Sequence, residues 1–265
     1  MNGLEHIAAV FSQKKTQGRA ALMPYFTLGF PTSEESLAVV QAISAAGADL
    51  IELGVPFSDP LADGPTIQHS AQVALDNGIT VKVCLEMVRS LRERGVHQPL
   101  MLMGYYNPIL SYGPERFAAD ACQAGADGLI VPDLPLEEAH ALEAACHAAG
   151  LALVYLVAPT TPDDRLEKIA RRSSGFVYVV SLVGVTGARS QVNSSLPEFL
   201  ARIRQKTDRA IAVGFGISTP EQAARVGKLA DGVIVGSALI DTVGKANYPA
   251  RAAGAFIQAI SQALA

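Results

Sequence analysis

A short phrase recurs along the chain and marks places where a helix gives way to a strand. Its three copies read Ala46-Gly47-Ala48-Asp49-Leu50-Ile51-Glu52, Ala124-Gly125-Ala126-Asp127-Gly128-Leu129-Ile130-Val131 and Leu229-Ala230-Asp231-Gly232-Val233-Ile234-Val235. In each copy a glycine or another small residue ends a helical pattern, and an apolar strand begins a few residues later. Apolar strands that alternate with amphipathic helices indicate a parallel sheet covered by helices.

The same alternation runs through the rest of the chain. Apolar stretches predict eight strands, at 21–27, 50–54, 100–105, 128–131, 151–157, 176–181, 210–213 and 232–235. Helical patterns follow them at 33–46, 81–94, 114–124, 136–149, 162–172, 196–206, 220–229 and 249–264. For a chain of 265 residues this favours a single (β/α)8 TIM barrel, with residues 1–265 as one domain. A doubly wound open sheet is the alternative, because closure is not visible in a sequence.

Two further helical patterns lie outside this alternation. Leu4, Ile7, Ala8 and Phe11 form an apolar stripe at helical spacing, so we expect an extra N-terminal helix that covers the bottom of the barrel. Residues 66–77 predict an added short helix after the second strand. The connection that contains it is long, and long loops at the catalytic face usually have a function.

Composition excludes several classes of protein. The net charge is −4, and no long Lys/Arg run or basic stripe is present, which argues against nucleic acid or an anionic membrane as the main partner. No apolar run approaches the roughly 18 residues of a membrane span, and the N-terminus has no apolar segment typical of a signal peptide. We therefore expect a cytoplasmic protein, or a plastid protein whose transit peptide has been removed.

Cysteine and histidine spacing predicts neither disulfides nor a metal site. Cys84, Cys122 and Cys146 are scattered without a Cys-x-x-Cys pair, so we expect three reduced core thiols. The five histidines show no ligand spacing, and we predict no metal.

The second predicted strand runs into a stiff acidic loop, Glu52-Leu53-Gly54-Val55-Pro56-Phe57-Ser58-Asp59-Pro60-Leu61-Ala62-Asp63-Gly64-Pro65. Glu52 lies in a segment otherwise suited to burial, and burial would raise its pKa, as a proton-transfer group requires. Asp63, on a turn expected to be solvated, should stay ionised. Two carboxyls in unlike environments can serve as acid and anion in one site. Helix capping and turn formation are the alternative roles, and spacing does not decide between them.

Glycine-rich loops follow the last three predicted strands. They read Gly184-Val185-Thr186-Gly187-Ala188-Arg189, Gly214-Phe215-Gly216-Ile217-Ser218 and Gly236-Ser237-Ala238. Glycines let backbone N–H groups approach an anion closely, and a helix N-terminus adds the positive end of its dipole. Barrels often bind phosphate after strands seven and eight, so we favour a phosphate site over plain turns.

Tyrosines near the predicted strand ends could line a flat pocket. The candidates are Tyr25, Tyr105, Tyr106 and Tyr178. Tyr178 is the strongest, because its strand also leads to a glycine loop, although ordinary packing explains any single ring equally well.

Together these stretches resemble the tryptophan synthase α subunit family. The acidic loop looks like the family signature, and Pro24-Tyr25-Phe26-Thr27-Leu28-Gly29, Tyr105-Tyr106-Asn107-Pro108, Val131-Pro132-Asp133-Leu134-Pro135, Gly184-Val185-Thr186-Gly187 and Gly214-Phe215-Gly216-Ile217-Ser218 follow in matching order. The resemblance implies a carbon–carbon lyase that cleaves indole-3-glycerol phosphate into indole and glyceraldehyde 3-phosphate in tryptophan biosynthesis. It implies no cofactor in this chain.

The resemblance also implies roles for individual residues. Glu52 would act as general acid and base at indole C3, Asp63 would hold the indole N–H, and Tyr178 would pack near Glu52. The indole would be bounded by Tyr25, Met103, Tyr105 and Ile130. The phosphate would rest on Gly187, Gly216, Gly236 and Ser237. Thr186 would order its loop over Asp63, whereas Leu182 and Gly104 stand at positions to which we assign no role.

A partner is implied as well, a pyridoxal-phosphate β subunit in an α2β2 heterotetramer, which would contact residues 56–60 and 107–110. Two other functions stay open. One is a different phosphate-binding barrel enzyme, such as a sugar-phosphate isomerase, and the other is a non-catalytic regulatory subunit.

Overall fold

The computed structural model describes residues 1–180, 196–214 and 216–265, and its centre is a parallel β-barrel. The strands are β1 (Ala21–Thr27), β2 (Ile51–Gly54), β3 (Leu100–Met103), β4 (Gly128–Ile130), β5 (Ala152–Val154), β6 (Leu156–Val157), β7 (Phe176–Val180), β8 (Ala210–Gly214) and β9 (Gly232–Val235). Their order is β5-β4-β3-β2-β1-β9-β8-β7-β6. The two ends of this order, β5 and β6, are separated by Tyr155 alone, so one chain segment pairs with β4 on one side and β7 on the other. The sheet therefore closes, which confirms the predicted (β/α)8 barrel.

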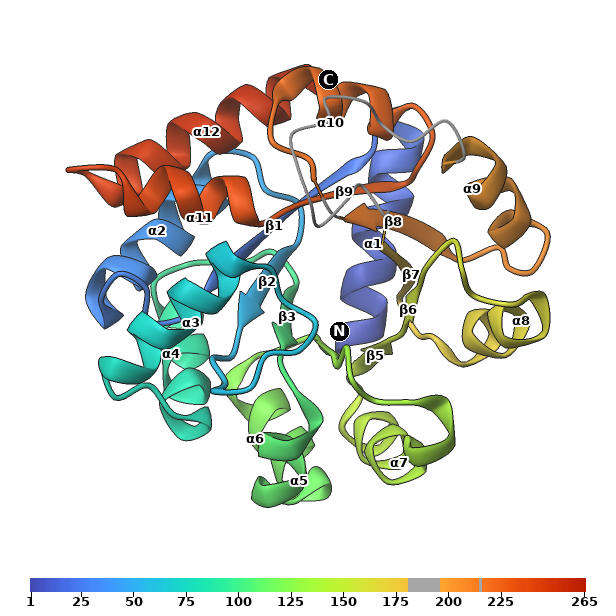
Figure 1. Ribbon diagram of the computed structural model, residues 1–265, viewed down its shortest axis with the longest axis horizontal. Helices are drawn as coiled ribbons and strands as arrows, with labels where there is room; N and C mark the ends of the chain where they lie inside the picture. The colour runs from blue at the N-terminus through green and yellow to red at the C-terminus, as the bar shows by residue number, and fades with distance from the viewer. Residues whose placement is uncertain (181–195, 215) are drawn as a thin grey trace.

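All helices except α1 surround the barrel as an outer ring, and α1 lies across one end of the barrel (Figure 1). The helices are α1 (Gly3–Thr16), α2 (Ser33–Ala45), α3 (Pro65–Asp76), α4 (Val81–Glu93), α5 (Tyr106–Tyr112), α6 (Pro114–Ala124), η1 (Leu136–Glu138), α7 (His140–Ala149), α8 (Asp163–Arg172), α9 (Leu196–Arg204), α10 (Pro220–Gly227), α11 (Ser237–Gly244) and α12 (Pro249–Ala263). Within the described ranges, none of these helices has the length and hydropathy needed to cross a bilayer.

The two extra helices lie where the sequence predicted them. α1 crosses the N-terminal end of the barrel, where Ile7 and Phe11 join the interior cluster, the buried side chains inside the barrel such as Met23, Met101 and Phe176. The rings of Phe11 and Phe176 lie 5.7 Å apart, centroid to centroid. α3 is the added helix after β2, and Pro65 begins it at a position that suits the fixed φ of proline.

Several predictions on single elements were wrong. The predicted strand at 151–157 is divided into β5 and β6, and the predicted helix at 136–149 into η1 and α7. The third strand ends at Met103 and not at residue 105, because Tyr105 is the N-cap of α5. Cys122 is exposed on α6, whereas Cys84 and Cys146 are buried thiols as expected.

The recurring phrase has a structural role at the N-terminal end of the barrel. In each copy, the aspartate side chain accepts a hydrogen bond from the backbone N–H of a residue near the start of the neighbouring strand. The backbone N–H of the aspartate donates to the carbonyl of that same strand residue. A serine makes the same two-bond clamp between β5 and β7. The four pairs are Asp49 with Leu22, Asp127 with Leu100, Ser174 with Leu153 and Asp231 with Ile211, with bonds of 2.7 to 2.9 Å.

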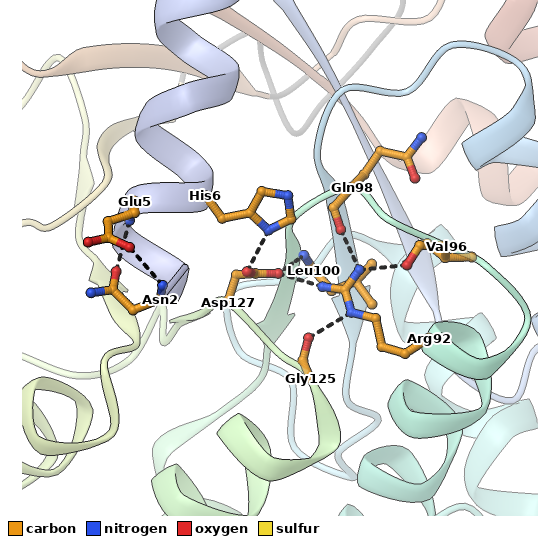
Figure 2. A network of polar contacts seen from close by, with 9 residues as sticks. All are labelled: Asn2, Glu5, His6, Arg92, Val96, Gln98, Leu100, Gly125 and Asp127. Carbon is orange, nitrogen blue, oxygen red and sulfur yellow. Dashed lines mark hydrogen bonds and ion pairs between the residues drawn. The ribbon is translucent and has the colours of Figure 1, made fainter.

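The Asp127 clamp extends into a larger network (Figure 2). Its carboxylate lies 2.8 Å from Nδ1 of His6 on α1 and 2.6 Å from Nη2 of Arg92 on α4. Arg92 also donates to three backbone carbonyls, those of Val96, Gln98 and Gly125. One carboxylate therefore connects α1 and α4 to the starts of β3 and β4.

Candidate active site

Glu52 points into the barrel interior. Ile51 and Leu53 pack outward beneath the helices, so the alternation of side chains along β2 turns Glu52 inward. It is in register with Tyr25 on β1 and Met101 on β3. Its side chain is 0% exposed, and neither carboxyl oxygen has a hydrogen-bond partner in the described part of the chain. Burial raises the pKa of Glu52 well above its ordinary value, so this group retains its proton to higher pH than a surface glutamate.

Two buried tyrosines lie beside Glu52. Burial raises the pKa of Tyr25 and of Tyr178, and the nearby carboxyls of Glu52 and Asp63 raise both further. Tyr25 comes from the adjacent strand, whereas Tyr178 belongs to β7. Both phenol groups therefore lie near the two acids and stay protonated.

Glycines at the strand ends make room for these rings. A Cβ atom at Gly54 would overlap the Tyr25 hydroxyl, and one at Gly214 would lie 2.7 Å from the Tyr178 hydroxyl. Both distances are shorter than side chains tolerate, so the absence of a side chain at Gly54 and Gly214 is what allows the tyrosines to extend across the barrel mouth.

Asp63 lies at the end of the acidic loop, directly before α3. The Tyr105 hydroxyl accepts a 3.0 Å hydrogen bond from the N–H of Ala62, and the Tyr105 ring packs 5.5 Å from that of Phe57. Asp63 is half-buried, and this burial raises its pKa from 3.8 to about 6, against the opposing effect of a hydrogen bond with Tyr105. The expectation of a solvated turn was therefore wrong, because Tyr105 and the loop shield the carboxyl. At neutral pH Asp63 is still largely ionised.

The remaining residues predicted for the indole pocket occupy the same half of the barrel. Met103 and Ile130 are in register with Gly54, one inward layer beyond Glu52 toward the C-terminal strand ends. Both belong to or pack against the interior cluster. Together with Tyr25 they form an apolar wall next to Glu52.

The predicted anion cradle lies at this end too. Gly216 follows β8 with a φ of 76°, and Gly236 is the N-cap of α11, where no side chain of the described residues caps the helix. Ser237 is exposed at the first position of α11. A Cβ atom at Gly236 would lie 3.4 Å from that of Tyr25, which places this helix start next to the Tyr25 side chain and hence on the Glu52 side of the barrel. Thr186, Gly187 and Leu182 lie outside the described residues.

A pair of buried hydroxyls was missed by sequence reasoning. Thr27 at the end of β1 and Ser70 on α3 are both 0% exposed and lie 2.7 Å apart. Nothing in the sequence separates them from surface hydroxyls, because their meeting depends on how α3 packs. Across the described ranges, no three His, Cys, Asp or Glu side chains gather into a group that could hold a metal ion.

Comparisons with known proteins agree on one family. The family model for the tryptophan synthase alpha chain matches residues 11–264. The tryptophan synthase alpha chain of Roseiflexus sp. (strain RS-1) is 54% identical over 252 residues, which cover 94% of this chain and 97% of that relative. Tryptophan synthase of Saccharomyces cerevisiae is 49% identical over 243 residues, 91% of this chain but 34% of the yeast protein. A chain of Mycobacterium tuberculosis tryptophan synthase superposes with a TM-score of 0.90 at 38% identity and covers 97% of both chains. The chain therefore belongs to the tryptophan synthase alpha chain family.

Proposed function

We propose that Glu52 and Asp63 carry out the reaction of this family, the cleavage of indole-3-glycerol phosphate into indole and glyceraldehyde 3-phosphate in tryptophan biosynthesis. The observation that carries the proposal is the Glu52 carboxyl, fully buried and without a hydrogen-bond partner in the described residues. An unpaired buried carboxyl is costly, so its presence is best explained by a substrate that supplies the partner. We take residues 1–265 to act as one barrel domain.

In the proposed steps, Glu52 gives one proton and takes one proton back, so no other residue has to transfer a proton. Protonated Glu52 gives its proton to indole C3, and the ring nitrogen becomes cationic. Asp63, ionised at neutral pH, accepts a hydrogen bond from that N–H and stabilises the charge. The carboxylate of Glu52 then takes the proton of the glycerol hydroxyl next to C3, the carbon–carbon bond breaks, and its electrons return to the ring. Indole and the aldehyde leave, and Glu52 is protonated again.

Binding of the substrate is assigned to the surrounding wall and helix starts. The indole ring would lie against Tyr25, Met103, Tyr105 and Ile130, with Tyr178 packed near Glu52. The phosphate would accept hydrogen bonds from the amides of Gly187, Gly216 and Gly236 and from the hydroxyl of Ser237. The start of α11, which no described side chain caps, supports this assignment, because a helix N-terminus favours an anion. Thr186 would order its loop over Asp63.

The partner proposed is a tryptophan synthase β subunit, in an α2β2 heterotetramer that receives indole in the cytoplasm. Pyridoxal phosphate would belong to that subunit, and this chain would bind no cofactor. Leu110 on α5 is 55% exposed and Leu61 in the acidic loop 92%, both at the C-terminal end of the barrel, where an apolar contact would cover them. The yeast relative, of which this chain matches 34%, has room for a second unit in the same polypeptide.

A substitution of Glu52 tests the proposal. Glu52→Gln keeps the shape but removes the transferable proton, so kcat for indole release should fall by roughly a hundredfold or more, while a glycerol-phosphate analogue binds with unchanged Kd. Glu86→Gln, at an exposed position on α4, is the matched control and should retain full activity. Retained turnover in Glu52→Gln would defeat the assignment.

The same assay separates the alternatives. A sugar-phosphate isomerase would consume a pentose phosphate and leave indole-3-glycerol phosphate untouched. A purely regulatory subunit would cleave neither alone, and would change only the rate of an added β subunit.

A further inference from the structure

The buried hydroxyls of Thr27 and Ser70 form the centre of a directed hydrogen-bond chain. The Ser70 hydroxyl lies 2.9 Å from the carbonyl of Ile67 in its own helix and 2.7 Å from Oγ1 of Thr27. Since a carbonyl can only accept, the Ser70 hydrogen goes to Ile67 and the Ser70 oxygen accepts from Thr27. Thr27 in turn has a lone pair for the Tyr25 hydroxyl, 3.4 Å away. Tyr25 therefore donates to Thr27, Thr27 donates to Ser70, and Ser70 donates to the carbonyl of Ile67.

This chain connects the barrel interior to α3. Tyr25 is in register with Glu52, and Thr27 is the last residue of β1. Asn77, the C-cap of α3, adds a second attachment, because its Nδ2 donates to the carbonyls of Gly29 at 3.0 Å and Pro31 at 2.7 Å. The middle of α3, through Ser70, and its C-terminal end, through Asn77, are thus held to β1 and the segment that follows it.

Asp63 is attached to the beginning of the same helix. It is separated from α3 by Gly64 alone, and the side-chain amide of Gln68 donates to the Asp63 carbonyl at 2.9 Å. A change in the position of α3 would therefore move the backbone of Asp63. Glu52, on the rigid strand β2, would not follow.

We propose that Ser70 is a positioning residue: through Thr27 it holds α3, and with α3 Asp63, at a fixed place relative to Glu52. The assignment rests on the proposed function, in which both carboxyls act on one indole ring. Loss of the Ser70 hydroxyl leaves Thr27 without its buried acceptor and loosens α3 from β1.

The test compares variants on both sides of this bond. Ser70→Ala should lower kcat roughly tenfold or more, since small displacements of a catalytic group are costly. It should also shift the acidic limb of the pH profile to lower pH, because water admitted around Asp63 favours its ionised form. Thr27→Val should reproduce both effects, and Thr27→Ser should restore them to wild-type values. The phosphate of the substrate also titrates in this pH range, but it does so equally for every variant and therefore does not produce a shift between variants.

Two controls separate positioning from general destabilisation. Ser173→Ala removes another fully buried serine hydroxyl, at the C-cap of α8, and should leave kcat and the pH profile unchanged. The double variant Ser70→Ala/Thr27→Val should be no slower than the slower single variant, because each single variant already removes the bond between Ser70 and Thr27. If Ser70→Ala does not fold, Thr27→Val carries the same prediction.

A folded Ser70→Ala with wild-type kcat and acidic limb would overturn the positioning role, as would effects that multiply in the double variant. If either result is obtained while Glu52→Gln is inactive, the positioning role fails and the proposed function stands. An active Glu52→Gln would overturn both.

Discussion

Glu52 is held in the barrel interior at a cost in stability. The ordinary pKa of a glutamate, 4.5, applies to the unfolded chain, whereas burial raises the pKa of the folded one well above it. Between these two values the folded protein holds a proton that the unfolded chain has released. The free energy of unfolding should therefore fall as pH rises from 4.5 through the folded pKa.

Glu52→Gln removes this titration, which gives a prediction on stability. The variant should be more stable than the wild-type protein at about pH 8, and the difference should vanish at about pH 4, where both side chains are neutral. Urea unfolding at the two pH values measures it. A difference of the same size at both would contradict the raised pKa of Glu52.

The pH dependence of turnover should report Asp63. Because the proposed reaction needs its ionised form and its pKa is about 6, kcat should fall as pH drops through that value. The hydrogen bond from Tyr105 favours the ionised form, so Tyr105→Phe should move the acidic limb to higher pH. Asp63→Asn should be slow at all pH values. A limb that stays in place in Tyr105→Phe would show that another group controls it.

Glu52 could be singled out from the sequence because an acid between Ile51 and Leu53 is unusual in an apolar strand. The environment of Asp63 could not, since it depends on Tyr105, which lies 42 positions further along the chain. Thr27 and Ser70 carry no local signal at all. Side chains whose role depends on a distant partner are the ones that sequence reasoning missed.

At the level of elements, the aspartate of the recurring phrase explains why the phrase marks helix-to-strand joints. Its carboxylate and its N–H both bond to one residue at the start of the neighbouring strand, so the two strands begin in fixed register. The phrase was visible in the sequence, but its hydrogen bonds were not. Ser174 makes the same clamp without belonging to any copy of the phrase.

Two of the clamps provide a matched pair of substitutions. Asp127→Ala leaves Arg92, His6 and the N–H of Leu100 without their shared acceptor, and should lower the free energy of unfolding by about 3 kcal/mol. Ser174→Ala removes a neutral clamp and should cost about 1 kcal/mol. Both lie at the N-terminal end, so kcat of the folded fraction should not change. If urea unfolding shows that the two substitutions lower the free energy of unfolding equally, the charged network around Asp127 adds nothing to stability.

The predicted strands and helices were mostly correct because buried parallel strands are continuous apolar runs. The exceptions have local causes. Tyr105 begins α5 where a strand was expected to continue, and Tyr155 separates β5 from β6 within one predicted strand. Both of these departures occur at a tyrosine, a residue equally suited to strand interiors and to loop packing, whereas the predicted helix at 136–149 divides at Ala139.

For the whole molecule, closure of the sheet is the property that brings the site together. Glu52 on β2 and the helix start after β9 are far apart in sequence, but β1 lies between their strands and Tyr25 contacts both neighbours. An open doubly wound sheet would not have placed Tyr178 next to Glu52. No periodicity in the sequence reports closure, because it depends on how the first and last strands meet.

The central claim is that the acids of the second βα unit and the helix starts after β8 and β9 act on one bound substrate. The most direct measurement is a crystal structure of Glu52→Gln soaked with indole-3-glycerol phosphate. We predict the phosphate within hydrogen-bond distance of the amides of Gly216 and Gly236, and the indole between Tyr25 and Asp63 with C3 facing residue 52. A phosphate bound elsewhere, or an indole ring turned away from residue 52, would contradict the account.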